Sequence, residues 1–310
     1  MIDRRRFLKS GLTLAAGAAC SWPFDLLAAK PESALRLTIL HTNDVHSHLE
    51  PMKSGDYAGL GGASARASLI SRVREQEKHV LLLDAGDVFQ GTPYFNIFKG
   101  EPEARAMSAM RFDAGTIGNH EFDAGIERLA EVIRTHMNFP ILNCNYGING
   151  TPLEGATREH LVIEKEGLRI GLLGLGIRLE GLVFPGYYGD LRYRDPIADA
   201  KRVATHLREE EKCDFIICLS HLNLYARRVG DAASQPGDRD LIREVPEIDL
   251  VIGGHNHIYL ERPDVYYRKE STGFIAQAGW AGTHMGRLSF DIFGRSKREV
   301  AGWTIHPAVA

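Results

Sequence analysis

Short apolar runs alternate with longer amphipathic stretches along this chain, and most of the apolar runs break abruptly into polar, glycine-containing turns. The runs occupy residues 35–40, 79–83, 113–117, 139–143, 214–219, 248–252 and 274–278. Short, mostly apolar segments bounded by turn residues are typical of buried β-strands. We therefore interpret each run as one strand.

Amphipathic stretches lie between these strands and predict helices at 63–78, 101–112, 124–136, 196–212 and 238–245. In the first of them, Leu69, Ile70 and Val73 recur on one helical face. Two antiparallel pairs are also expected: a hairpin at 161–175 that turns at Gly167, and a closing pair at 286–292 and 299–305. Strands that alternate with helices in this way predict an α/β fold.

The composition restricts the class of protein but does not indicate a function. The chain has 310 residues, of which 44% are hydrophobic and 25% charged, as in ordinary globular proteins. The net charge of −3 gives no sign of a surface for a nucleic-acid polymer, so we expect no such partner. Four cysteines lack the spacing of a zinc finger or a redox motif, and we interpret Cys213 and Cys218 as small buried side chains.

The first thirty residues match an export signal. Two arginines, one further residue and then Phe-Leu-Lys form the twin-arginine pattern at Arg4–Lys9, and a weakly apolar stretch follows at 11–19. That stretch is too short to cross a bilayer as a mature helix. We predict a signal over 1–30, cleaved after Ala29 or lipidated at Cys20, one catalytic domain over 35–310, and a periplasmic or envelope-associated protein that is not transmembrane when mature.

The stretch from Gly118 to Asp123 carries the densest candidate chemistry. Asn119 offers an amide oxygen to a metal or an oxyanion, and His120 can exchange a proton near neutral pH. Asp123, three residues later, can hold the His120 ring in one tautomer. Taken alone, the stretch is equally consistent with a surface turn.

Four more strand ends carry side chains of the same kind. Because ligands of α/β sheets gather beyond the carboxyl ends of strands, we expect all five ends to converge on one site. The oxygen and imidazole donors suit Mn²⁺, Zn²⁺ or Fe, with Mg²⁺ as a further option, and the absence of thiolate argues against structural zinc. The predicted metal ligands are Asp44, His46, Asp87, Asn119, His221, His255 and His257.

Seven ligands exceed the needs of one tetrahedral ion and suit two ions that share a carboxylate. Asp87 is the natural bridge because it is the lone candidate in its loop. Two adjacent metals bind phosphoryl oxygens and lower the pKa of a bridging water to give hydroxide. Asn119 and His120 would then contact the substrate, and His120, held by Asp123, would assist the leaving oxygen.

Each piece also has a plain structural interpretation. A lone Asp-x-His is usually a turn, a lone histidine is usually a satisfied core residue, and a lone aspartate is usually a cap. The glycine-rich segment 55–62 lacks the spacing of a P-loop and is interpreted as a flexible connector that could flank the pocket, as could 181–188. Among the other histidines, His48 and His284 are the ones that could line a cleft.

The order of these motifs resembles the calcineurin-like metallophosphoesterase superfamily, most closely the catalytic domain of the bacterial 5′-nucleotidase family. The resemblance extends from about residue 35 to 307. It rests on Asp44-x-His46, Gly86-Asp87-x-x-Gln90-Gly91, Gly118–Asp123, Ser220-His221 and Gly254–His257.

The resemblance implies a four-layer α/β/β/α sandwich with two central mixed sheets. It also implies one metal on Asp44, His46, Asp87 and His257, a second on Asp87, Asn119, His221 and His255, and His120 with Asp123 as the catalytic pair. Family members with full 5′-nucleotidase activity carry a second domain that stacks the base. The resemblance is closest to single-domain members, so a separate substrate-binding domain protein is an expected partner.

The sequence thus predicts an exported dinuclear metallophosphohydrolase that acts on nucleoside 5′-monophosphates or related nucleotides. An alternative within enzymes is a phosphodiesterase or pyrophosphatase that acts on cyclic or sugar nucleotides. An alternative of another class is a metal-loaded protein that binds nucleotides for a partner, which would need no oriented acid such as His120.

Overall fold

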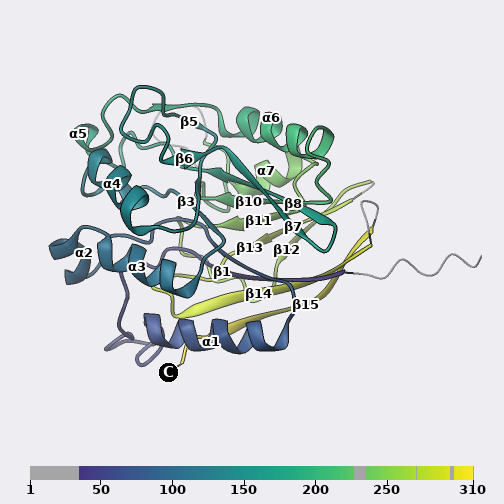
Figure 1. The fold of residues 1–310 in the computed structure, drawn as a ribbon, viewed down its shortest axis with the longest axis horizontal. Helices are drawn as coiled ribbons and strands as arrows, with labels where there is room; N and C mark the ends of the chain where they lie inside the picture. The colour runs from purple at the N-terminus through teal and green to yellow at the C-terminus, as the bar shows by residue number, and fades with distance from the viewer. Residues whose placement is uncertain (1–34, 227–234, 270, 294–296, 310) are drawn as a thin grey trace, which may run out of the picture. The chain divides into compact units, whose positions relative to one another are not determined.

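The computed structural model describes residues 35–226, 235–269, 271–293 and 297–309. The predicted export signal lies outside these residues. Within them, no helix is both long and apolar enough to cross a membrane. Two large mixed sheets stand face to face, and helices cover the outer face of each (Figure 1).

The first sheet has the strand order β15-β14-β1-β2-β3-β4-β6. The pairs from β1 to β6 are parallel, whereas β14 runs antiparallel to both β1 and β15. Its strands are β1 (Leu35–Thr42), β2 (Val80–Asp84), β3 (Ala114–Thr116), β4 (Ile141–Leu142), β6 (Thr157–Arg158), β14 (His284–Phe293) and β15 (Lys297–Pro307).

The second sheet has the order β12-β13-β11-β10-β8-β7, with parallel pairing from β13 to β8 and an antiparallel strand at each edge. Its strands are β7 (His160–Lys165), β8 (Leu168–Leu175), β10 (Phe215–Ser220), β11 (Leu250–Gly253), β12 (Asp264–Tyr267) and β13 (Thr272–Ala276). A small separate pair joins β5 (Tyr146–Gly147) to β9 (Arg192–Tyr193).

The helices of the first sheet's outer face are α1 (Ala63–Gln76), α3 (Glu101–Met110) and α4 (Ile126–His136), and those of the second are α6 (Pro196–Glu209) and α7 (Asp238–Glu244). The short elements are α2 (Pro93–Phe98), α5 (Pro185–Tyr188) and the 3₁₀ turn His120–Phe122. Local chemistry sets the start of α6, because Asp195 caps the amides of Ile197 and Ala198 and proline occupies the first turn.

Side chains of each central strand alternate between two apolar layers. In β2, Leu82 packs under the helices of the first sheet, while Leu81 and Leu83 face the second sheet. In β8, Leu172 faces the first sheet and Leu173 packs under α6. Both faces of each sheet are therefore buried, which explains why these strands are apolar throughout.

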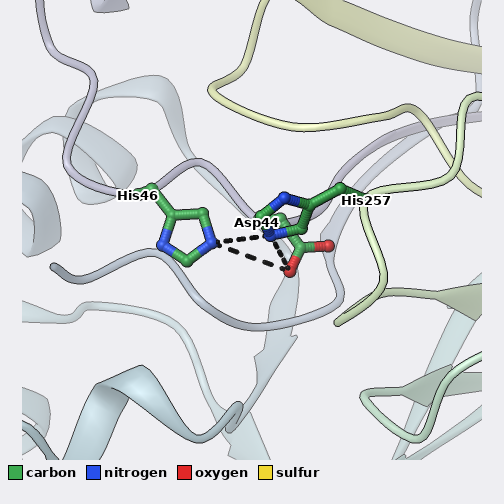
Figure 2. A group of neighbouring side chains, drawn as sticks. All are labelled: Asp44, His46 and His257. Carbon is green, nitrogen blue, oxygen red and sulfur yellow. Dashed lines mark hydrogen bonds and ion pairs between the residues drawn. The ribbon is translucent and has the colours of Figure 1, made fainter. Parts of the chain in front are cut away.

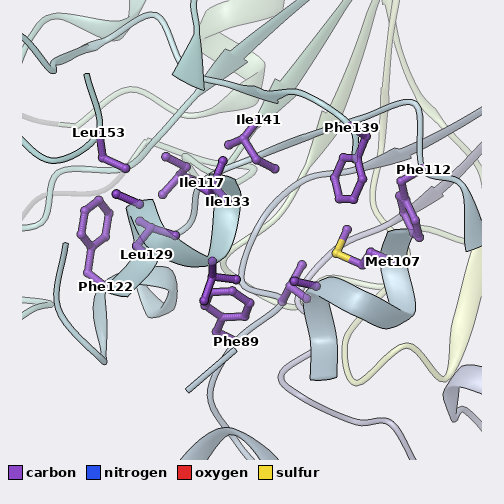
Figure 3. Close-up of a cluster of buried hydrophobic side chains, with 14 of the residues drawn as sticks. Phe89, Met107, Phe112, Ile117, Phe122, Leu129, Ile133, Phe139, Ile141 and Leu153 are labelled. Atoms are coloured by element: carbon purple, nitrogen blue, oxygen red, sulfur yellow. The ribbon is translucent and has the colours of Figure 1, made fainter. Parts of the chain in front are cut away.

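The apolar layer between the first sheet and its helices is rich in aromatic and aliphatic side chains (Figure 3). Phe122 and Ile117, which flank the Asn119–His120 turn, are both anchored in it. The turn that carries the catalytic candidates thus rests on a packed base. The three apolar layers confirm the predicted four-layer α/β/β/α sandwich with two mixed sheets.

Most predicted elements are present, and the differences lie at sheet edges and short turns. The predicted strand 139–143 is reduced to β4, and α2, β5, β6, β9 and β12 are missing from the sequence-based assignment. The predicted hairpin is confirmed, with Gly167 at a positive φ of 85° between β7 and β8. Cys144, Cys213 and Cys218 are buried free thiols.

Candidate metal centre and catalytic pair

The ligand-bearing loops meet because the parallel strands of each sheet end level with one another. Thr42 at the end of β1 pairs with Asp84 at the end of β2, and Ser220 at the end of β10 pairs with Gly253 at the end of β11. The loops after these strands therefore leave from one edge of the sandwich. Candidate ligands from both sheets lie together there.

Asp44, His46 and His257 form the first group, with ligand atoms within 4.8 Å of one another. The Nε2 atoms of His46 and His257 lie 3.0 Å apart, and Asp44 Oδ1 lies 3.9 Å from the first and 3.5 Å from the second (Figure 2). All three donors point at one small volume. Two of them come from the loop after β1 and the third from the loop after β11.

Asp87, His221 and His255 form the second group, also within 4.8 Å of one another. His221 Nε2 lies 3.0 Å from Asp87 Oδ2 and 4.0 Å from Asp44 Oδ1, so Asp44 links the two groups. His221 Nδ1 is 2.7 Å from the Ala85 carbonyl, to which its N–H donates. That hydrogen bond turns the other ring nitrogen toward the site.

Asn119 and the backbone of His120 complete the contacts of the second group. The Asn119 side-chain oxygen lies 2.8 Å from His255 Nδ1. The His120 N–H donates to Asp87 Oδ1 at 2.8 Å. The structure thus brings all seven predicted ligands to one edge, with the His120 turn in direct contact with the second group.

His120 and Asp123 form a hydrogen-bonded pair at the border of the metal-ligand groups. Asp123 Oδ2 accepts from His120 Nδ1 at 2.7 Å, and the His120 ring lies 5.2 Å from the His46 ring. Burial disfavours the charged ring, but the Asp123 hydrogen bond and the Asp87 charge outweigh it and raise the pKa of His120. His120 is therefore suited to hold a proton near neutral pH.

The backbone of the ligand loops is unusual. Non-glycine residues rarely adopt positive φ, because the side chain crowds the following carbonyl. Among the candidate ligands that the structure describes, positive φ angles occur at Asp44 (50°), His46 (50°), Asp87 (54°), His255 (78°) and His257 (55°). Such residues cluster where function constrains the chain, at a cost on the order of 1 kcal/mol each.

Gly118 permits a close approach between two of these loops. A Cβ atom at this position would lie 2.1 Å from Asp87 Oδ1 and 2.7 Å from the Asp87 backbone nitrogen. Any side chain here would displace the Asp87 carboxylate. The glycine that opens the predicted motif is therefore required by the position of a ligand.

The site fits divalent cations in its donor chemistry. When neutral, His221 carries its proton on Nδ1, and its Nε2 lone pair then faces the Asp87 carboxylate; His46 and His257 likewise direct nitrogen atoms at each other. Electron-rich atoms at such distances repel unless a proton or a cation lies between them. Burial also raises the pKa of Asp44, since an uncompensated buried carboxylate is unfavourable.

Two supporting residues were not identified from the sequence. Glu121 accepts hydrogen bonds from four backbone amides around Asp87, and Asn43 joins the metal-ligand loop to the loop before Trp280 through Gly279 O and Ala278 N. Sequence reasoning assigned Glu121 no role although it lies inside the predicted motif. Its spacing from Asp87 gave no signal, because their contact is made only in the folded chain.

Comparison with known proteins shows which family this chain resembles. A family described as calcineurin-like phosphoesterase matches residues 37–259. The 5′-nucleotidase of Vibrio cholerae is 32% identical over 280 residues, covering 84% of this chain and 49% of that protein. The chain therefore spans about half the length of this curated relative.

Solved structures agree with the fold. The Haemophilus influenzae NAD nucleotidase matches with a TM-score of 0.77 and 25% identity, over 89% of this chain and 50% of that one. A 5′-nucleotidase precursor from Thermus thermophilus matches with a TM-score of 0.74 and 28% identity, over 88% of this chain and 54% of that one.

Proposed function

The chain belongs to the calcineurin-like phosphoesterase family, whose members hydrolyse phosphoester bonds. From this premise we propose that it is a dinuclear phosphomonoesterase that acts on nucleoside 5′-monophosphates or related nucleotides. The observation that carries the proposal is the meeting of two three-residue ligand groups beside an oriented histidine–aspartate pair. Metal binding alone would not require that pair.

The proposed ligand assignment follows the two groups. One cation would be held by Asp44, His46 and His257, the other by His221, His255 and Asn119, with Asp87 shared. Two divalent cations supply Lewis acidity toward phosphoryl oxygens and lower the pKa of bound water. Mn²⁺, Zn²⁺ and Fe suit this mixture of imidazole and oxygen donors. Mg²⁺ is a harder cation and is a further option.

His120 is the proposed general acid. Its Nδ1–H is directed to Asp123, so Nε2 is the ring nitrogen left to face the leaving-group oxygen. The raised pKa favours the protonated ring, and donation from Nε2 would neutralise the alcohol oxygen as the P–O bond breaks. The Asn119 amide adds a neutral donor beside the phosphoryl group.

The nucleotide part of the proposal is supported by the names of the relatives. Both the Vibrio cholerae protein and the Thermus thermophilus precursor are called 5′-nucleotidases, whereas the Haemophilus influenzae neighbour is called an NAD nucleotidase. The name of the Haemophilus influenzae neighbour supports the alternative, a pyrophosphatase or phosphodiesterase. The same two groups of ligands serve either reaction, since the phosphorus centre is alike.

Phosphate release from a panel tests the proposal. Purified protein loaded with Mn²⁺ or Zn²⁺ is assayed with a nucleoside 5′-monophosphate, a cyclic nucleotide, a sugar nucleotide and a simple alkyl phosphate. We expect the monophosphate to be hydrolysed fastest, and His120→Ala to lose about 10²–10⁴-fold in kcat while retaining its metals. The matched control is His136→Ala, a partly buried histidine at the end of α4 that belongs to neither metal-ligand group.

Other outcomes of the same panel separate the alternatives. Faster cleavage of the cyclic or sugar nucleotide supports the phosphodiesterase or pyrophosphatase. Slow release from every ester, accelerated by a separately added substrate-binding domain, supports a partner protein. Bound metals and bound nucleotide without any release, unchanged in His120→Ala, would overturn the hydrolase proposal in favour of a binding protein.

Export by the twin-arginine route is proposed from the sequence of residues 1–30. Replacing Arg4 and Arg5 together by lysine keeps the charge and removes the recognition pattern. We expect the full-length double variant to remain in the cytoplasmic fraction while the unaltered chain reaches the envelope. Equal export of both would contradict this route.

A further inference from the structure

A cleft of about 450 Å³ opens beside the first metal-ligand group. Its walls are two segments, Ser47–Lys53 and Gly91–Tyr94. The first begins directly after His46, and the second packs against the His46 backbone so closely that a Cβ at Gly91 would lie 2.7 Å from His46 O. The cleft contains none of the proposed metal ligands and neither member of the catalytic pair.

The walls of the cleft are fastened together at their base. Ser47 Oγ and Thr92 Oγ1 lie 2.7 Å apart, and the Thr92 hydroxyl also donates to the Ser47 carbonyl at 3.1 Å. The buried Arg66 guanidinium donates twice to the His48 carbonyl, at 3.2 and 3.1 Å. These bonds hold the cleft open in advance of any ligand, which lowers the entropic cost of binding.

The chemistry of the cleft is an apolar surface with a few polar groups at its rim. Met52, Pro51 and the Tyr94 ring supply apolar and aromatic area, while the Tyr94 hydroxyl donates to Glu50 Oε1 at 2.9 Å. Lys53 Nζ lies 3.1 Å from Glu50 Oε2. Pockets of roughly 300–1,000 Å³ with this composition accommodate small organic ligands.

One residue joins the cleft to the metal-ligand groups. His48 lines the cleft, and its ring meets the Trp280 ring edge-to-face at 5.6 Å. Trp280 in turn lies flat against the His257 ring, with centroids 5.7 Å apart and planes inclined by 3°. Two successive ring contacts therefore connect the first metal-ligand group to the cleft.

We infer that this cleft binds the nucleoside portion of the substrate, with Tyr94 as the stacking face for the base and Glu50 as the acceptor for its amino group or the ribose hydroxyls. The inference rests on the proposed nucleotidase function for its substrate. It assigns base recognition to this chain, a role that the sequence suggested a separate domain would supply. Aromatic stacking of a base is worth enough to control affinity without contributing to the chemistry.

Steady-state kinetics test the inference through the ratio of the kcat/KM values for two substrates, a nucleotide and glycerol phosphate. For Tyr94→Ala we expect KM for a nucleoside 5′-monophosphate to rise about 10-fold with kcat nearly unchanged. Glycerol phosphate has no base, so the preference for the nucleotide over it, measured as the ratio of kcat/KM values, should fall by the same factor. Tyr94→Phe keeps the ring and should restore most of the preference.

Tyr267 provides the matched control, since it is a tyrosine on β12 that is 81% exposed and does not line the cleft. Tyr267→Ala should leave both substrates unaffected. An unchanged nucleotide preference in Tyr94→Ala would overturn the inference and leave the hydrolase proposal intact.

Binding of adenosine, which carries no phosphate, separates failure of this inference from failure of the proposed function. Equilibrium dialysis with the metal-loaded protein should show adenosine binding that weakens about 10-fold in Tyr94→Ala. If no ester is hydrolysed and this binding is nonetheless observed, the cleft is a nucleoside site and the enzyme proposal fails. If the unaltered protein does not bind adenosine, the inference fails.

Discussion

The Glu121 carboxylate accepts a hydrogen bond from the backbone N–H of Asp87 at 2.9 Å, although the two residues belong to loops after different strands. It also accepts from the backbone amides of Gly118 at 2.6 Å, Val88 at 2.7 Å and Phe89 at 3.2 Å. One buried side chain thus fixes the loop that presents the proposed shared ligand.

Replacing Glu121 by glutamine tests this arrangement. The amide keeps the shape but turns an NH₂ group toward backbone donors that then have no acceptor, so we expect a loss of roughly 1–3 kcal/mol in unfolding free energy. Metal affinity should fall about 10–100-fold, because ligand support is lost. Urea unfolding and metal titration measure both effects, with the exposed Glu127→Gln on α4 as control. Unaltered metal affinity would show that the loop holds its shape without Glu121.

The pH dependence of turnover depends on His120. Its raised pKa means that the ring keeps its proton to a higher pH than an ordinary histidine, so activity should be lost as pH rises through that pKa. Asp123→Asn removes the hydrogen-bonded charge that favours the cation, and burial then lowers the pKa. We expect the alkaline loss of kcat to move to lower pH in Asp123→Asn, measured as a pH–rate profile, with the exposed Asp190→Asn as control. A profile that stays in place would exclude His120 as the acid.

The close approach of the two sheets gives a stability prediction. Gly174 on β8 lies against the first sheet, where an added Cβ would come within 2.1 Å of the Leu142 carbonyl oxygen and 2.8 Å of Thr116 Oγ1. We expect Gly174→Ala to lose about 1–3 kcal/mol or more in urea unfolding, because backbone atoms must separate. Gly302→Ala is the matched control, since no atom lies within 4 Å of its added Cβ. Equal stability of the two variants would mean that the sheets can separate without cost.

Sequence periodicity predicted the interior of the sandwich well, because both faces of the central strands are buried. Runs such as Val80–Asp84 and Phe215–Ser220 are almost wholly apolar and predict strands, which the structure confirms. The edges were harder to predict. The half-buried β12 consists of Asp264–Tyr267 alone, and β4 pairs through only Ile141 and Leu142, so neither is long enough to show a clear period.

The candidate ligands could be predicted because each directly follows an apolar strand, and strand ends of one sheet meet by topology. The surroundings of the ligands could not. Trp280 lies flat against His257 although 23 positions separate them. Tyr94 lines the cleft together with Ser47–Lys53, a segment more than forty residues earlier in the chain. These contacts depend on how loops from different strands pack, which single-sequence patterns do not encode.

Metal removal provides the last prediction. A ligand that binds only the folded state stabilises it by about 4 kcal/mol when present at roughly 1,000 times its Kd, so chelation of the loaded protein should lower its Tm. The effect should be strong here, because buried His221 and Asp87 lie 3.0 Å apart and depend on an intervening proton or cation.

Asp87→Asn should abolish this shift, since the shared ligand loses its charge while asparagine tolerates the positive φ of 54°. His120→Ala should keep the shift, because it removes the acid and no ligand. Scanning calorimetry before and after treatment with EDTA compares the three proteins. A chelator-dependent Tm in Asp87→Asn equal to that of the unaltered chain would show that Asp87 does not bind the cations, and the assignment of a shared carboxylate would have to move to Asp44, which links the two groups through His221.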